Sequence, residues 1–115
     1  MIFVIDDNDV MAECIANATK KEVKIFANAI EAMQKIADGD VPELIFLDIL
    51  LDGPDGFTFL NELTSYDDTA KIPVVIVSSL DFTKKDLSVY GVVGVLNKDV
   101  MKPEDIDNYA KQYAK

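Results

Sequence analysis

Five short runs of apolar residues recur along the chain, and no other feature of the sequence constrains its fold as tightly. Each run has four or five residues and is rich in Val, Ile or Phe. This pattern is typical of strands that are buried on both faces. Segments of helical length separate the runs, which lie at residues 2–5, 23–27, 44–47, 74–77 and 92–96.

The intervening segments carry helical periodicity and helix-start signals. Asn28 followed by Glu31 resembles a capping box, and Pro103 suits the first turn of the last helix. On the first predicted helix, Cys14 is expected to be a small buried hydrophobic residue, as free cysteines usually are. The predicted helices lie at residues 10–19, 28–37, 55–66, 84–90 and 103–115.

Strands that alternate with helices predict an α/β fold. Right-handed crossovers then give a doubly wound, five-stranded parallel sheet with helices on both faces. With 115 residues the chain is expected to form a single domain over residues 1–115, with no output domain. In such sheets the functional crevice lies at the carboxyl ends of the strands, where the strand order switches.

The charge balance excludes one class of function. The chain has 21 acidic and 11 basic residues, no histidine and a net charge of −10. Nucleic-acid phosphates are bound through clustered Lys and Arg, so direct binding to DNA or RNA is not expected. Metal cations or basic partner surfaces are favoured instead. The start, MIFVIDDN, lacks the features of a signal peptide or a membrane span, so a cytoplasmic protein is expected.

Polar residues follow four of the five predicted strands, and in a parallel sheet they would meet at one edge. They are Asp6 and Asp7 after the first strand, Asp48 after the third, Ser78 and Ser79 after the fourth, and Asn97 and Lys98 after the fifth. Carboxylates about 4 Å apart repel by roughly 4 kcal/mol per pair at an effective dielectric of 20. Three of them therefore need a cation, and Mg²⁺ with its oxygen ligands meets that need.

This set of groups suits phosphoryl transfer to a carboxylate. Aspartate is an established nucleophile for forming an acyl phosphate, and a metal ion with a lysine can neutralise the transferring group. Asp48 is the natural acceptor because it stands alone at the end of its strand. Lys98 would supply a movable charge, and the Ser78 hydroxyl could bond a phosphoryl oxygen.

Each residue also has a plainer interpretation. Asp6 and Asp7 could only cap the first helix, because Asp is a preferred N-cap residue. Ser78 could bond its own backbone, and Lys98 could be a solvated loop lysine.

In order and spacing the motifs resemble the receiver (CheY-like) domain of two-component response regulators. The resemblance runs the length of the chain and rests on the acidic pair Asp6-Asp7, on Asp48 with Asp55-Gly56 after it, on Ser78 and on Lys98. It implies a flavodoxin-like sheet of order 2-1-3-4-5. It also implies phosphotransfer from a sensor histidine kinase, or a phosphotransfer domain, to Asp48.

The same resemblance implies a metal site and further partners. Mg²⁺ would be bound by Asp7, Asp48 and the backbone carbonyl of Leu50, with Asp6 acting mainly through water. A receiver dimer or an effector domain is a possible partner, while no membrane is implied. As a signalling phosphoacceptor, such a domain catalyses only its own phosphorylation and dephosphorylation.

The chain departs from the family pattern around Lys98. Asp99 follows the lysine where the family usually has proline, and Val95 stands where an aromatic residue commonly changes rotamer. A cis bond without proline would cost roughly 2.5–4 kcal/mol, so a trans bond and a rearranged loop are predicted. In that loop Lys98 would approach Asp48 only once phosphate is bound. Switching would then proceed through Ser78 and the segment 79–90.

Two leucines are predicted to control the lifetime of the phosphorylated state. In the family, the positions of Leu50 and Leu80 flank the path of the attacking water. Leucine cannot orient a water molecule by hydrogen bonding, so slow self-dephosphorylation is expected.

Two other functions remain open from the sequence. A phosphatase of the haloacid dehalogenase kind also uses an aspartate after a strand, but it needs a second acid two residues on, where this chain has Leu50. The other alternative is a pseudo-receiver, a binding module that keeps the fold without phosphotransfer. Val95 and Asp99 favour it, and the complete set of acids, hydroxyl and lysine argues against it.

Overall fold

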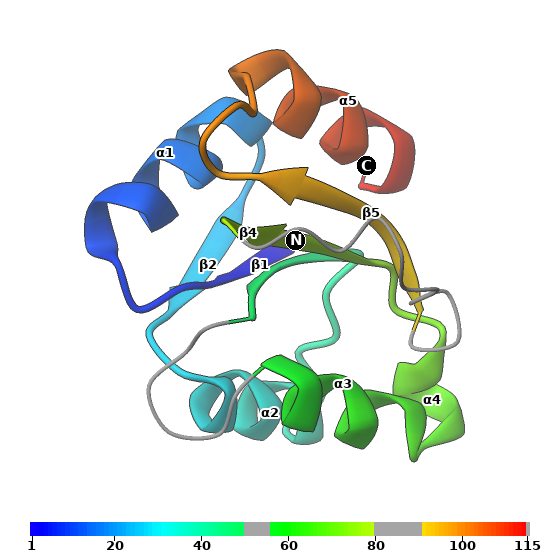
Figure 1. Ribbon diagram of the computed structural model, residues 1–115. Coiled ribbons are helices and arrows are strands. Elements are labelled where there is room, and N and C mark those ends of the chain that lie inside the picture. Colours follow the sequence, from blue (N-terminus) through cyan, green and yellow to red (C-terminus); the bar gives the residue numbers. More distant parts are fainter. Residues whose placement is uncertain (50–55, 80–90, 115) are drawn as a thin grey trace.

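A computed structural model of the chain describes residues 1–49, 56–79 and 91–114. It shows five parallel strands in one sheet, in the order β2-β1-β3-β4-β5 (Figure 1). The strands are β1 (Ile2–Ile5), β2 (Val23–Phe26), β3 (Leu44–Asp48), β4 (Val74–Ser78) and β5 (Val92–Asn97). The predicted α/β class and the strand order implied by the resemblance are both confirmed.

Helices cover both faces of the sheet. Helices α1 (Asp9–Thr19) and α5 (Pro103–Tyr113) lie on one face, and α2 (Ala29–Ala37), α3 (Gly56–Thr64) and α4 (Asp67–Ala70) lie on the other (Figure 1). The three central strands are buried on both sides, as their unbroken apolar runs require. Among the described residues no helix has the length and apolar character needed to cross a membrane.

Asparagine side chains cap the amino-terminal ends of the first two helices. The Asn8 Oδ1 accepts a hydrogen bond of 3.0 Å from the Met11 backbone N–H, and the Asn28 Oδ1 accepts one of 2.9 Å from Glu31. Each bond satisfies a helix donor that would otherwise have no partner. The predicted cap at Asn28 is confirmed. The first helix is capped by Asn8 and not by Asp6 or Asp7, which leaves both aspartates to another role.

The prediction that Cys14 is buried was wrong, because the residue is exposed. Helix α1 buries Ala12, Ile15 and Thr19 instead, and Val10 is 75% exposed. Successive helical residues are turned by about 100°, so Cys14 points well away from the direction of Ile15. The buried side of α1 therefore runs through Ala12, Ile15 and Thr19 and leaves Cys14 in solvent.

Two further differences concern the segment after β3. Helix α3 ends at Thr64, and the four-residue helix α4 follows, which the sequence did not predict. The Thr69 hydroxyl, which donates to the backbone carbonyl oxygens of Leu63 and Tyr66, holds this extra turn. The predicted cap at Asp55 and the predicted helix at 84–90 lie outside the described residues.

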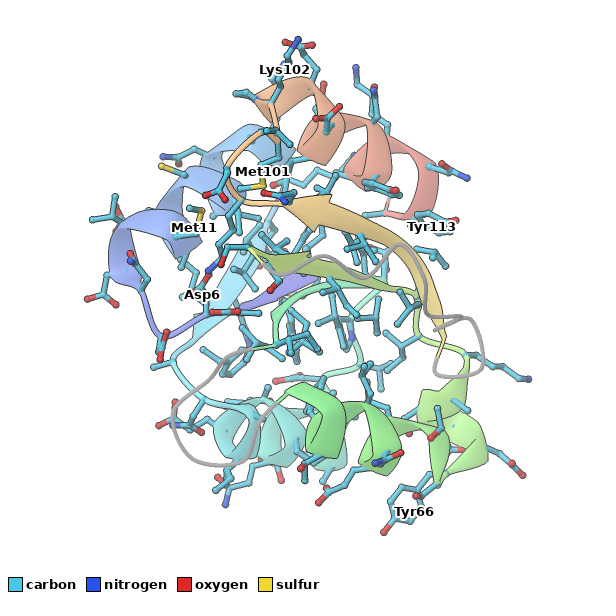
Figure 2. All side chains as sticks on the ribbon, in the orientation of Figure 1. Asp6, Met11, Tyr66, Met101, Lys102 and Tyr113 are labelled. Atoms are coloured by element: carbon cyan, nitrogen blue, oxygen red, sulfur yellow. The ribbon has the colours of Figure 1, made fainter. Side chains whose placement is uncertain are left out.

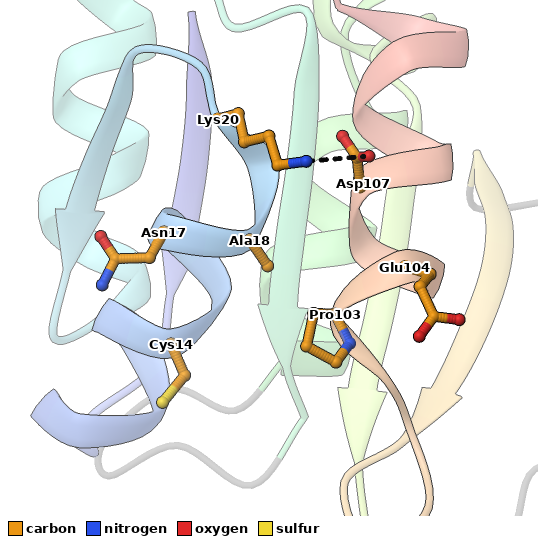
Figure 3. Close-up of a pocket in the computed structure, with 7 residues that line it drawn as sticks. All are labelled: Cys14, Asn17, Ala18, Lys20, Pro103, Glu104 and Asp107. Atoms are coloured by element: carbon orange, nitrogen blue, oxygen red, sulfur yellow. Dashed lines mark ion pairs between the residues drawn. The ribbon is translucent and has the colours of Figure 1, made fainter.

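Ion pairs join α5 to α1 on the upper layer. Asp107 Oδ2 lies 3.7 Å from Lys20 Nζ on the turn after α1 (Figure 3). It also lies 3.1 Å from Lys111 Nζ on its own helix. The hydrogen bond from Lys111 and the nearby positive charges lower the pKa of Asp107 below its ordinary value, against a smaller opposing effect of burial. Helix α5 also fits closely on β5, since a Cβ atom at Gly94 would overlap the Tyr109 ring. These contacts fix the helix that follows the Lys98 loop.

Candidate functional site

Parallel pairing brings the predicted strand-end residues to one edge of the sheet. Ile5 of β1 lies beside Leu47 of β3, so Asp6 and Asp48, which follow them, are level with each other. Ser78 ends the neighbouring strand β4. Figure 2 shows Asp6 at the end of β1, close to where α1 begins. The parallel sheet predicted from the five apolar runs therefore brings these polar residues together.

Three carboxylates gather at this edge. One oxygen from each of Asp6, Asp7 and Asp48 lies within 4.8 Å of the others. Asp6 is 2% exposed and Asp48 is 5% exposed, while Asp7 faces solvent. Two buried carboxylates this close are unfavourable unless positive charge compensates them.

Lys98 supplies part of that positive charge. Its Nζ lies 3.1 Å from Asp6 Oδ2 and 3.2 Å from Asp48 Oδ2. Burial lowers the pKa of Lys98, but the nearby Asp6 carboxylate, followed by that of Asp48, outweighs this effect and raises the pKa above the ordinary value of 10.5. The ammonium therefore stays charged at neutral pH and bridges the two buried aspartates.

The predicted trans bond in the Lys98 loop is confirmed. Every described peptide bond is trans, the bond between Lys98 and Asp99 included. Lys98 Nζ donates a 3.2 Å hydrogen bond to Asp48 Oδ2, and the expected response of this contact to phosphorylation stays a prediction. The Asn97 Oδ1 accepts a 2.8 Å hydrogen bond from the Asp99 N–H, and the Lys98 N–H donates to the Ser78 carbonyl oxygen at 3.0 Å. These two bonds hold the loop without a proline.

Asp6 carries the clearest sign that the site takes a cation. Its Oδ1 accepts a 2.9 Å hydrogen bond from the Asn8 N–H. Its Oδ2 is buried and makes no hydrogen bond of good geometry, although Lys98 Nζ is near. Among the residues that the structure describes, three carboxylates face one ammonium here, which is an excess of two negative charges. The residues therefore fit a divalent metal ion with oxygen ligands.

The other predicted residues differ in how far the structure places them. Ser78 is 1% exposed at the end of β4, whereas the neighbouring Ser79 is exposed. Val95 lies on β5 with 40% of its surface exposed, and no aromatic ring occupies that position. Leu50 and Leu80 lie outside the described residues.

Two asparagines with structural roles at the site were missed. Asn8 orients Asp6 and caps α1, and Asn97 shapes the Lys98 loop. The signal was present for both, because Asn next to a strand end favours local side-chain to backbone bonds. A search limited to groups that react or bind metal does not find such residues.

Comparison with known proteins decides the family. The sequence profile described as "Response regulator receiver domain" matches residues 2–111. The chain belongs to the response regulator receiver family. As a receiver domain it is a signalling phosphoacceptor and not a classical enzyme, which sets aside the haloacid dehalogenase alternative.

Individual relatives agree with this assignment. The response regulator PleD of Caulobacter vibrioides is 30% identical over 82 residues, which cover 70% of this chain but only 18% of PleD. The chain thus spans less than a fifth of that relative. The receiver domain of NtrX from Brucella abortus superposes with a TM-score of 0.82 at 26% identity, covering 98% of this chain and 97% of that one. The phosphorylated cyanobacterial phytochrome response regulator RcpA gives 0.74 at 26% identity, covering 96% and 88%.

Proposed function

We propose that Asp48 of this receiver domain accepts a phosphoryl group from a histidine of a sensor kinase or phosphotransfer domain, with Mg²⁺ bound beside it. One observation carries the proposal. Asp48 is a buried carboxylate at the strand edge, 3.2 Å from a lysine and within a cluster that still has excess negative charge. The structure of the relative RcpA is that of a phosphorylated protein.

The three aspartates differ in ways that favour Asp48 as the acceptor. Asp6 has one oxygen held by the Asn8 N–H, and it follows the end of β1. Asp7 is exposed on the loop before α1. Asp48 lies between the ends of β1 and β4, and it alone has both Lys98 and the Ser78 strand end beside it.

The proposed metal ligands are Asp7, Asp48 and the backbone carbonyl of Leu50, with Asp6 acting mainly through water. Leu50 lies outside the described residues, so the carbonyl ligand rests on the family resemblance. A bound Mg²⁺ would neutralise negative charge on the transferring group. The negative charge of the clustered Asp6, Asp7 and Asp48 carboxylates favours the binding of such a cation.

The chain's own residues would then position and neutralise the phosphoryl group. An oxygen of Asp48 forms the new bond to phosphorus while the bond from phosphorus to the histidine nitrogen breaks, and the imidazole leaves. Lys98 already touches Asp48, so its ammonium can follow the phosphoryl oxygens with a small side-chain movement. The Ser78 hydroxyl, at the end of the next strand, would bond another of those oxygens.

Self-dephosphorylation is proposed to be slow. Leu50 and Leu80 offer no hydrogen bond to an attacking water, and positioning is most of what a protein contributes to phosphoryl transfer. Decay of the phosphorylated wild type should be about tenfold slower than decay of Leu50→Asn/Leu80→Glu, equivalent to roughly 1.4 kcal/mol of barrier. Equal decay rates would show that the leucines do not control water access.

Switching is proposed to pass through Ser78 and the segment 79–90, since Val95 has no ring to move. Beryllofluoride, which mimics the phosphoryl group, should shift the NMR signals of this segment. Shifts confined to 48–56 would contradict the proposal. A single domain over 1–115, a cytoplasmic location and a receiver dimer or effector partner remain predictions.

The decisive experiment is intact-mass analysis after incubation with acetyl phosphate and Mg²⁺. The expected result is a gain of one phosphoryl group in the wild type and none in Asp48→Asn or in EDTA. Asp107→Asn is the matched control, because it makes the same chemical change on α5, and it should be phosphorylated normally. If neither acetyl phosphate nor a phosphorylated phosphotransfer protein modifies the wild type, the chain is a pseudo-receiver.

A further inference from the structure

A second concave surface lies in the helical layer formed by α2, α3 and α4. It is a groove of about 470 Å³ between the carboxyl-terminal half of α2 and the junction of α3 with α4. A smaller hollow continues it toward the start of α2 and shares Met33 and Glu62 with it. A volume of this size is in the range of pockets that bind small ligands or a partner's side chains.

Apolar residues are exposed along this groove. Ile30 is 54% exposed, Val41 is 51% exposed and Tyr66 is 64% exposed, and all three line one of the two hollows. Figure 2 shows Tyr66 extending away from the sheet at the end of the lower layer. Single exposed apolar residues are ordinary, but several along one concavity are typical of a binding surface.

The walls of the groove are held in place by local hydrogen bonds. On one side the Gly39 N–H donates to the Ile36 carbonyl oxygen at 3.0 Å, and the Val41 N–H donates to Gly39 at 3.1 Å. Gly39 adopts a φ of 105°, which favours glycine, and this turn places Val41 at the rim. On the other side, the Thr69 hydroxyl fixes the turn that carries Tyr66. A preformed groove loses little entropy when it binds.

The charged residues at the rim of the groove indicate what kind of partner it binds. Glu62 and Asp68 line the groove, and no lysine or arginine among the described residues lines either hollow. We infer that the α2–α3 groove binds a short peptide segment that presents a large apolar side chain flanked by lysine or arginine. The apolar side chain enters between Met33 and Val41, and the basic residues pair with the two acids. The exposed ring of Tyr66 offers a cation a further contact.

This groove is separate from the phosphoacceptor site. Its lining residues come from α2, α3, α4 and the turn after α2, and none of them is Asp6, Asp7, Asp48 or Lys98. Binding there does not depend on phosphorylation of Asp48, so the inference stands or fails independently of the proposed function.

NMR titration of the labelled chain with a synthetic peptide tests the inference. The probe is acetyl-Lys-Leu-Phe-Lys-Leu-Lys-amide, and the control peptide replaces its three apolar residues with serine. We expect saturable shifts at Met33, Val41 and Tyr66, with the control peptide binding at least about tenfold more weakly. Equal binding of the two peptides would overturn the inference, because charge alone would then explain the interaction.

Matched variants separate the groove from the general negative charge of the chain. Glu62→Gln/Asp68→Asn should weaken binding of the probe by about fivefold, as expected for two exposed ion pairs. Glu13→Gln/Glu22→Gln removes the same charge from exposed positions outside the groove and should leave binding unchanged. Equal weakening by both variants would contradict the inference.

The apolar contribution is tested in the same way. Val41→Ser/Tyr66→Ser should weaken binding by about tenfold, whereas Val93→Ser/Val100→Ser, which changes exposed apolar residues on and after β5, should have no effect. Thermal unfolding of each variant establishes that it is folded. A folded Val41→Ser/Tyr66→Ser variant that binds as the wild type does would overturn the inference.

Discussion

Two clusters of lysine and aspartate occur on this receiver domain, and they have opposite balances of charge. At the strand ends three carboxylates face Lys98, and two of them are buried. Between α1 and α5, Asp107 faces two lysines, and those lysine side chains are 75% and 67% exposed. The residue types and the distances are similar, so burial and the sign of the excess charge make the difference.

The comparison shows that lysine–aspartate ion pairs of similar length can have different consequences. Around Asp107 two lysines pair with one carboxylate, and water screens their exposed ammonium groups, so the cluster helps to join α5 to the turn after α1. Around Asp48, one ammonium among the described residues faces three carboxylates, two of which are buried. The strand-end cluster is therefore the place that takes a cation and a phosphoryl group.

Replacement of Lys98 should produce the largest change in stability. Lys98→Met leaves Asp6 and Asp48 buried without their counter-ion, and we expect the free energy of unfolding to fall by about 2 kcal/mol in EDTA. Lys20→Met, which removes an exposed partner of Asp107, is the matched control and should change it far less. Urea unfolding measures both. Equal losses in the two variants would remove the distinction between the clusters.

Magnesium should stabilise the chain through the strand-end cluster alone. At a concentration about five times the dissociation constant, Mg²⁺ should raise the free energy of unfolding by about 1 kcal/mol. Asp7→Asn should reduce the increase, and Asp107→Asn should leave it intact. The unfolding temperatures of the wild type and both variants, measured in EDTA and in Mg²⁺, test this prediction. If Asp107→Asn abolishes the increase, the metal binds elsewhere.

The smallest effect is expected for Asp107 itself, and it should depend on pH in a defined direction. The pKa of Asp107 is lowered in the folded chain, chiefly by Lys111, so its ion pairs stabilise the fold above the unfolded pKa. This contribution is lost as the pH falls through the folded pKa. The difference in unfolding midpoint between wild type and Asp107→Asn should be constant above about pH 5 and shrink below about pH 4. A difference that grows toward acid would contradict the assignment.

Much of the fold and the site could be predicted because both depend on simple regularities. Five apolar runs fix a parallel sheet, and a parallel sheet brings Asp6, Asp48 and Ser78 to one edge without any knowledge of side-chain contacts. Helix capping at Asn28 follows from local chemistry in the same way. In each case the signal lies in a few neighbouring residues or in the topology alone.

The failures have a different origin. Exposure of Cys14 depends on which side of α1 meets the sheet, and that in turn depends on packing across the whole layer. Helix α4 is held in part by the Thr69 hydroxyl, which donates to the carbonyl oxygen of Leu63 on α3. Such features arise from tertiary contacts that no periodicity encodes.

The central claim is that Asp48, among the three clustered aspartates, receives the phosphoryl group. Borohydride reduces an aspartyl phosphate to homoserine, so trapping the acetyl phosphate-treated protein and mapping its peptides by mass spectrometry identifies the acceptor directly. The account predicts homoserine at position 48 alone, and only when Mg²⁺ is present. Homoserine at position 6 or 7, or a phosphoryl group that survives reduction on Ser78, would contradict it.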